Sequence, residues 1–384
     1  MKMENMKSIL LAVFCAGVLV SCDDERLDFK EHEVVPPPVA TSEFAGGADI
    51  SSVTEFESKG VRFYNKDGVE TECTALMRQL GMNAIRLRVW VNPKDGFCDK
   101  SDVIAKAKRA RALGMRLLID FHYSDTWADP GTQKVPELWK DYDITGLAQA
   151  LRDHTVDVLQ GLKSNGIDVE WVQVGNETTS GMVWPEGRLM WDSCRSESFG
   201  RYAELSNAGY DAVKRVYPDA TVIVHHDNGQ YDTTWFYDEL LQHGGKFDMI
   251  GLSLYPDHER WKKDIDNAAA YAKSMSRHFD VPVMIVETGY SNVDEVRAEK
   301  VMKELMARMV GVVSGVFYWE PEIYGGWDHT YWDGFWHTSP CVFGKKVVNN
   351  GAFTEKGEPS AALRALTRTA SVADMSGMIH DMRD

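Results

Sequence analysis

Short apolar runs alternate with longer helix-like stretches along most of this chain. Eight runs predict strands, at residues 47–51, 84–91, 116–121, 170–175, 221–225, 249–254, 283–286 and 313–318. Helical periodicity occupies several of the gaps between them, at 69–80, 101–113, 147–165, 202–217, 268–278 and 296–310. Strands that alternate with helices form parallel sheets, and eight such units close most naturally into an α/β fold of the (β/α)8 TIM-barrel type. A doubly wound open sheet is the competing fold, but no glycine-rich phosphate-binding turn follows the first predicted strand.

Two glutamates follow predicted strands. Glu177 ends the sequence Gly175-Asn176-Glu177 after the fourth strand, and Glu287 follows the seventh. The carboxyl ends of the strands form the working face of a parallel barrel, so both acids can point at one bond. Two carboxylates at one bond are the minimal equipment for hydrolysing a glycoside. The alternative is that each acid caps its strand or pairs with a nearby arginine.

The second predicted strand carries arginines on one face only. Successive side chains of a strand point to opposite faces, so Arg86 and Arg88 share a face with Trp90. The apolar residues between them can pack on helices, whereas the arginines would point into the barrel and need acidic partners. We expect Arg86 to serve the site. For Arg88 a structural ion pair and a catalytic role are both open.

The N-terminal residues predict export. Lys2 and Lys7 precede the apolar run 8–20, which is too short to span a membrane and is typical of a secretory signal. The tripeptide before Cys22 resembles a bacterial lipobox, so we expect the signal at 1–21 to be removed and Cys22 to be lipidated. Ordinary secretion with a spare cysteine is the alternative.

The rest of the chain divides into a tether, a barrel and a tail. Residues 22–43, which are acidic at their start and contain three consecutive prolines, predict a flexible tether. Residues 44–369 are expected to form the barrel, and 370–384 a polar tail. The acidic residues after Cys22 resemble the surface-export signal of Bacteroidetes lipoproteins. That resemblance implies a lipid-anchored protein exposed on the cell outer membrane.

Charge and cysteine content exclude some partners. The formal net charge of -16 argues against nucleic acid or an anionic lipid surface, but a neutral polymer remains compatible. Twelve tryptophans suit stacking on sugar rings, although tryptophan is also a core residue. Cys73, Cys98, Cys194 and Cys341 show no metal-type spacing, and their disulfide connectivity cannot be read from sequence. We expect a monomer without a cofactor.

Several segments together resemble a known family. An Asn-Glu pair after strand four, with Arg, Tyr, Glu and Trp at strands two, six, seven and eight, resembles the large clan of retaining barrel glycosidases. Segments 47–52, 85–93, 120–131, 173–177 and 317–321 further resemble the family 53 endo-β-1,4-galactanases. The resemblance covers nearly the whole barrel. It implies an endo-acting enzyme on β-1,4-galactan, as found in type I arabinogalactan and pectic side chains.

The resemblance also implies roles for individual residues. Glu177 would be the general acid and base and Glu287 the nucleophile, roughly 5 to 5.5 Å apart. Glu177 should be held protonated, and Arg86 and Tyr255 should keep Glu287 ionised. Asn176 would bond the sugar 2-hydroxyl.

Further residues are candidates for sugar contacts. His122 would line the floor of the site, and Trp319 would form the platform beneath the sugar at the scissile bond. Asp49, Asp125 and the segment 227–229 with Asn228 are candidates for sugar hydroxyls, although turns use the same residues. A packing role is equally open for the aromatic candidates at further subsites, which are Trp127, Trp184, Trp327, Tyr331, Trp332 and Trp336.

Two questions remain open. Some bacterial members of the family hold calcium between long loops after strands seven and eight, but here 289–294 leads almost directly into a helix, so we expect no metal. The alternative functions are an endo-β-glycanase of the same clan on mannan, xylan or glucan, and a non-catalytic glycan-binding surface lipoprotein. The 122–131 motif argues against the first, and retention of both glutamates argues against the second.

Overall fold

The computed structural model describes residues 44–292, 294–323 and 351–366. The predicted signal (1–21), tether (22–43) and tail (370–384) lie outside the described residues. So do Cys22, Cys341 and the aromatic candidates Trp327, Tyr331, Trp332 and Trp336. Among the residues that the structure describes, none of the helices has the length and apolar character of a transmembrane segment.

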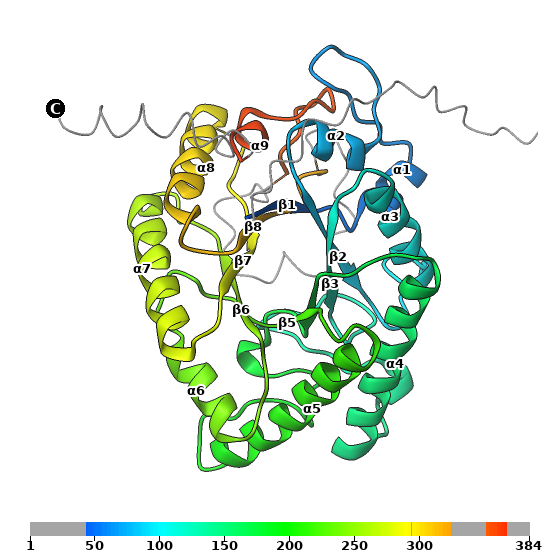
Figure 1. The fold of residues 1–384 in the computed structure, drawn as a ribbon, viewed down its shortest axis with the longest axis vertical. Helices are drawn as coiled ribbons and strands as arrows, with labels where there is room; N and C mark the ends of the chain where they lie inside the picture. The colour runs from blue at the N-terminus through cyan, green and yellow to red at the C-terminus, as the bar shows by residue number, and fades with distance from the viewer. Residues whose placement is uncertain (1–43, 293, 324–350, 367–384) are drawn as a thin grey trace, which may run out of the picture. The chain divides into compact units, whose positions relative to one another are not determined.

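Eight parallel strands close into a barrel in chain order (Figure 1). They are β1 (Ala45–Asp49), β2 (Ala84–Val89), β3 (Arg116–Phe121), β4 (Trp171–Val174), β5 (Thr221–His226), β6 (Met249–Leu254), β7 (Val283–Thr288) and β8 (Gly315–Trp319). Pairing of β1 with β8 completes the ring. The predicted (β/α)8 barrel is therefore confirmed.

Helices surround the barrel (Figure 1). They are α1 (Val53–Ser58), α2 (Cys73–Gln79), α3 (Lys100–Ala112), α4 (Ile144–Ser164), α5 (Arg195–Val216), α6 (Thr234–Gln242), α7 (Trp261–Phe279), α8 (Glu295–Met309) and α9 (Ala361–Ala365). Two short 3-10 helices, η1 (Glu137–Trp139) and η2 (Thr178–Ser180), lie in the loops after β3 and β4. Helices α1, α6 and α9 were not among the helical stretches named from the sequence, and α7 begins earlier than predicted.

Aspartates define the starts of several helices. Asp143 accepts a hydrogen bond from the Gly146 amide (2.8 Å) at the start of α4, and Asp99 accepts one from the Asp102 amide (2.8 Å) at the start of α3. A capping carboxylate satisfies an amide that has no partner within the helix and favours the positive end of the helix dipole. The capping aspartates therefore fix the residue at which each of these predicted helices begins.

The interior of the barrel has an apolar layer below a polar one. The apolar layer is a buried cluster of Ala45, Ala84, Leu118, Trp171, Ile223, Met249, Met284, Val286 and Phe317. Side chains two residues further along a strand point the same way. On six strands, a polar residue lies two or four positions beyond the residue of the apolar layer and therefore also points inward. These polar residues are Asp49, Arg86, Asp120, Gln173, His225 and Ser253. The apolar layer closes the bottom of the barrel and places a polar layer beneath its carboxyl-end mouth.

Candidate active site

Glu177 lies just beyond β4, in an unusual backbone conformation. Its φ of 46° and ψ of 53° fall in the left-handed region, which non-glycine residues rarely adopt. Gln133 Nε2 helps to hold this turn by donating to the carbonyl of Asn176 (2.8 Å). The Glu177 carboxylate accepts a hydrogen bond from Ser253 Oγ (2.7 Å). Backbone strain at one position that several contacts maintain is typical of functional sites.

Glu287 lies near the end of β7, and a β-bulge sets its direction. Met284 and Val286 both belong to the inner apolar layer, so strict alternation would turn Glu287 toward the helices. The pairing of β6 with β7 skips a residue, because Leu252 pairs with Ile285 while Ser253 pairs with Glu287. The extra residue turns Glu287 into the barrel. Ser253 is thus both the ladder partner of Glu287 and the hydroxyl donor to Glu177.

Two donors hold the Glu287 carboxylate. Arg86 Nη2 donates to Oε1 (2.8 Å) and the Tyr255 hydroxyl donates to Oε2 (3.0 Å). Hydrogen bonds of this kind to an ionised carboxylate favour the charged form. The predicted neighbours of Glu287 are therefore brought together with it.

Arg86 is the central cation of the site. Its Nη1 bonds Asp49 Oδ2 (2.6 Å), and its Nη2 bonds Asp120 Oδ2 (2.9 Å) in addition to Glu287. The side chain is only 1% exposed. Nη2 also donates to Asn176 Oδ1 (2.9 Å). One buried guanidinium therefore holds together three carboxylates from three different strands.

The two glutamates differ in proton affinity. Burial raises the pKa of Glu177 well above its ordinary value, and the nearby charges of Glu287 and Asp227 raise it further. Burial also raises the pKa of Glu287, to about 7, against the opposing effect of Arg86. The cation Arg86 lowers the pKa of Glu287, whereas the charges nearest to Glu177 are carboxylates that raise its pKa. The sequence predicted that Arg86 and Tyr255 would keep Glu287 ionised. Both donate to it, but burial still raises its pKa to about 7.

The Asn176 amide is fixed in one orientation. Its Oδ1 accepts from Arg86 and from Gln173 Nε2 (3.0 Å), and its Nδ2 donates to the Ala128 carbonyl (2.8 Å). Among the described residues no second acceptor for Nδ2 is found. The other amide hydrogen can therefore donate to a bound ligand.

A hydrogen-bond relay supports Glu177 from below. The Glu177 backbone amide donates to His225 Nδ1 (3.2 Å), which makes this nitrogen an acceptor and places the ring proton on Nε2. Nε2 lies 2.9 Å from Ser253 Oγ, so the ring donates to the hydroxyl that in turn donates to Glu177. Burial lowers the pKa of His225 well below its ordinary value, in keeping with a neutral ring.

His122 has a similar supporting position. Its Nε2 lies 3.0 Å from Asp120 Oδ2, and its Nδ1 accepts the Ala128 amide (3.0 Å). Burial lowers its pKa, so the ring is neutral. Both nitrogens bind protein atoms, and the ring packs edge to face near Trp127 at 6.1 Å. The buried location agrees with a floor residue, and direct sugar contact stays a prediction.

Arg88 links the aromatic residues around the mouth. Its guanidinium carbon lies 3.8 Å from the Trp127 ring centre and 4.7 Å from that of Trp90, and its Nη1 bonds Glu320 Oε1 (3.0 Å). Trp127 in turn lies 5.8 Å from Trp319. These contacts favour the structural interpretation that the sequence left open: a buried ion pair that orients two tryptophans.

Three polar candidates bind protein atoms in this structure. Asp49 is fully buried, accepts from the Ser51 amide (2.9 Å) and pairs with Arg86. Asp125 accepts the amides of Asn92 (3.0 Å) and Glu137 (2.8 Å), and thereby joins two loops. Asn228 Nδ2 donates to Asp227 Oδ2 (2.9 Å). Their predicted sugar contacts gain no support from these partners.

Three further expectations concern the cysteines, the connection after β7 and Trp184. Cys73 and Cys98 are buried free thiols and Cys194 is an exposed one. The connection from β7 to α8 is as short as predicted, since β7 ends at Thr288 and α8 begins at Glu295. Trp184 is half-buried and its indole nitrogen donates to the Ser180 carbonyl (2.9 Å), beside the Glu177 turn.

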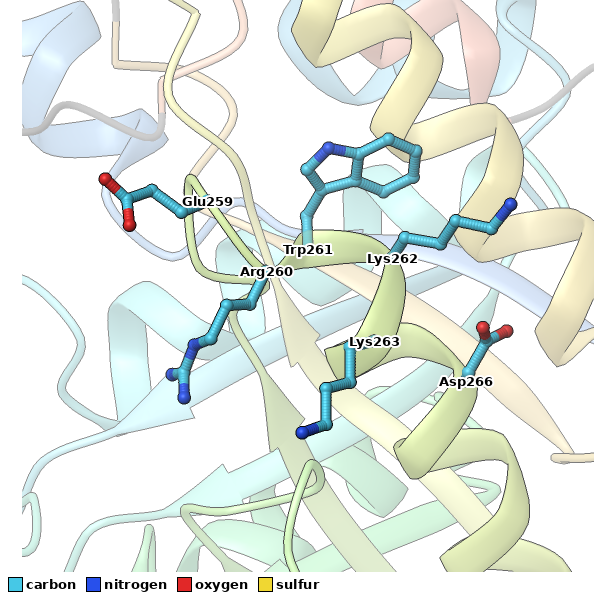
Figure 2. A pocket seen from close by; sticks show the side chains of 6 residues that line it. All are labelled: Glu259, Arg260, Trp261, Lys262, Lys263 and Asp266. Carbon is cyan, nitrogen blue, oxygen red and sulfur yellow. The ribbon is translucent and has the colours of Figure 1, made fainter.

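An open hollow elsewhere does not belong to this site. It lies at the start of α7 and is lined by Glu259, Arg260, Trp261, Lys262, Lys263 and Asp266 (Figure 2). Figure 2 shows that the charged side chains point apart and do not converge on one position. Convergent polar groups mark a binding site, so this hollow is a poor candidate.

A (β/α)8 barrel with a buried and a half-buried glutamate at its mouth, each in a different set of hydrogen-bond partners, has the architecture of a glycoside hydrolase. The comparisons with known proteins agree. Residues 45–309 match the family described as glycosyl hydrolase family 53. The chain therefore belongs to glycosyl hydrolase family 53.

Relatives and solved structures cover most of the chain. The arabinogalactan endo-β-1,4-galactanase of Humicola insolens is 33% identical over 349 residues, which are 84% of this chain and 98% of that protein. A fungal β-1,4-galactanase structure aligns with a TM-score of 0.72 at 31% identity, over 84% of this chain and 99% of that one. The family 53 catalytic domain from Ignisphaera aggregans aligns with a TM-score of 0.71 at 25% identity, over 86% and 97%.

Proposed function

We propose that this glycoside hydrolase cleaves β-1,4-galactan internally and with retention of anomeric configuration. The observation that carries the mechanism is the contrast between the two glutamates. Arg86 and Tyr255 donate to Glu287, whereas among the described residues only the Ser253 hydroxyl donates to the side chain of Glu177, whose pKa burial raises well above its ordinary value. The names of the galactanase relatives supply the substrate.

The first chemical step forms a bond between Glu287 and the sugar. The ionised Glu287 carboxylate attacks the anomeric carbon, while Glu177 gives its proton to the departing glycosidic oxygen. The old carbon–oxygen bond breaks as the carboxylate ester forms. Formation of the ester removes the negative charge of Glu287 next to Arg86, but Asp49 and Asp120 still neutralise the arginine.

The second step returns both residues to their starting states. Glu177, now ionised, takes a proton from a water molecule as that water attacks the anomeric carbon. Glu287 leaves as the carboxylate that Arg86 and Tyr255 favour. The amide hydrogen of Asn176 that is not bound to Ala128 can donate to the sugar 2-hydroxyl during both steps.

A panel of polysaccharides tests the substrate. The purified enzyme should release reducing ends from β-1,4-galactan at least about tenfold faster than from mannan, xylan or β-glucan, since a site built for one hydroxyl pattern leaves polar groups unpaired with another. Faster release from another polymer would replace galactan as the substrate. Binding to galactan without release from any polymer would indicate a non-catalytic protein.

We also propose that the enzyme is held at the cell surface through lipidated Cys22. The proposal rests on the sequence before the barrel: a short apolar run, a cysteine and an acidic tether. Several acyl chains anchor a protein firmly, whereas one does so only marginally. Cys22→Ala should move active enzyme from the membrane to the soluble fraction, and a variant that stayed with the membrane would rule out the anchor. Protease that failed to reach the wild-type barrel on intact cells would rule out surface exposure.

A further inference from the structure

Two exposed tryptophans lie close together outside the site described above. Trp191 is 56% exposed and lies between β4 and α5, and Trp235 is 39% exposed and is the second residue of α6. Their ring centres are 5.4 Å apart at an interplanar angle of 74°. Exposed aromatic surface of this kind on a soluble domain often marks a binding site. We call these two residues the indole pair.

The indole pair is held in place by its surroundings. The guanidinium carbon of Arg195 lies 5.6 Å from each of the two ring centres. Arg195 is itself fixed by an ion pair with Glu239 Oε1 (2.8 Å). Trp191 also packs edge to face on the buried Phe199, with ring centres 6.4 Å apart. Because these contacts restrict the two rings, a ligand would lose little binding energy in arranging them.

A continuous set of contacts connects the indole pair to Glu177. Trp235 packs on His226, the last residue of β5, with ring centres 6.3 Å apart. His226 Nδ1 lies 3.2 Å from Asp227 Oδ1, and the charge of Asp227 helps to raise the pKa of Glu177. The hydroxyl of Thr179, two residues after Glu177, donates to Asp227. His226 and Asp227 therefore connect the indole pair to the turn that carries Glu177.

The position on the barrel indicates which part of a polymer would reach the pair. Glu287 on β7 bonds to the sugar that stays on the enzyme, and Trp319 on the neighbouring β8 lies on the same side. Strands β4 and β5 lie across the barrel mouth from β8 and β1 (Figure 1). Glu177 follows β4 and protonates the departing oxygen. A chain that crosses the mouth would therefore extend its leaving-group side over the loops after β4 and β5.

We propose that the indole pair binds the galactan chain on its leaving-group side, beyond the sugars at the scissile bond. This inference rests on the proposed galactanase function. The axial 4-oxygen of each galactose, which carries the linkage in this polymer, leaves several C–H groups together on the opposite face of the ring, and such a face stacks well on an indole. Two indoles at a steep angle can hold a chain from below and from one side. A neutral polymer also meets no repulsion from the acidic protein.

The experiment compares long and short substrates. Trp191→Ala should lower kcat/KM on polymeric galactan about tenfold relative to kcat/KM on galactotetraose, because loss of a stacking contact is worth about one factor of ten. Trp191→Phe should restore part of the difference. Trp261→Ala is the matched control, since it removes an indole from the start of α7 (Figure 2) and should leave the ratio unchanged.

A binding measurement separates this proposal from the proposed function. In a Glu287→Ala background, Trp191→Ala should also weaken retardation of the protein by soluble galactan in affinity electrophoresis. An equal loss on polymer and tetrasaccharide, or no loss on either, would overturn the role of the indole pair while leaving the galactanase intact. If the wild type preferred another polymer in the panel, the same ratio measured on that polymer and its tetrasaccharide would decide the role of the pair independently of galactan.

Discussion

Glu287→Ala is expected to lower kcat on galactan by about 10⁴-fold or more, because no covalent intermediate can form without the nucleophile. The loss should be as large on an activated aryl galactoside, since every substrate needs the same bond to Glu287. Glu177→Ala should lower kcat on galactan by about 10²- to 10⁴-fold, the usual contribution of a general acid. It should spare formation of the intermediate from the aryl galactoside, whose leaving group needs no proton. Steady-state and burst kinetics on both substrates measure the contrast.

The matched control is Glu170→Ala. Glu170 lies just before β4, at the opposite end from Glu177, and forms an ion pair with Arg116 on the protein surface. Its loss should leave both activities within about twofold, because exposed ion pairs contribute little. If Glu177→Ala and Glu287→Ala lost both activities equally, the assignment of acid and nucleophile would be wrong.

Arg86→Met is expected to cause the largest loss of stability of any single substitution in the site. It would leave Asp49, Asp120 and Glu287 buried without their shared cation. Removing one partner of a buried ion pair costs about 3 to 5 kcal/mol in the free energy of unfolding. Activity should fall with it, because the pKa of Glu287 would rise further once the cation that lowers it is gone.

Urea unfolding of Arg86→Met and Arg308→Met compares the loss of a buried arginine with the loss of an exposed one. Arg308 pairs with Asp266 and Glu304 on exposed surface, and its loss should change the free energy of unfolding by no more than about 1 kcal/mol. Arg86→Lys should retain part of the stability, since it keeps the charge and loses the fork of donors. Equal destabilisation by the two methionine substitutions would show that the carboxylates around Arg86 do not depend on it.

Strand parity explains how much of the site the sequence could predict. Alternation in β2 alone placed Arg86 and Arg88 inside the barrel, and both are buried there. The same rule applied to β3 through β6 would also have found Asp120, Gln173, His225 and Ser253, which the sequence analysis missed. These residues orient Arg86, Asn176 and Glu177.

Other features depend on contacts that no local pattern reveals. The direction of Glu287 requires the bulge in β7, and alternation from Met284 and Val286 would have turned it outward. Asp49 and Asp125 looked equally suited to sugar hydroxyls, but Asp49 pairs with an arginine on the next strand and Asp125 with amides from two separate loops. A carboxylate has the same local sequence signature whether its partner is a ligand or a distant part of the chain.

Proton NMR of a galactan digest at early times tests the two-step mechanism most directly. The method records the anomeric configuration of the new reducing ends before they equilibrate in water. Attack by Glu287 followed by attack of water inverts the carbon twice, so the β anomer should appear first and the α anomer should follow only by mutarotation. Initial release of the α anomer would mean a single displacement by water, and Glu287 could not then be the nucleophile.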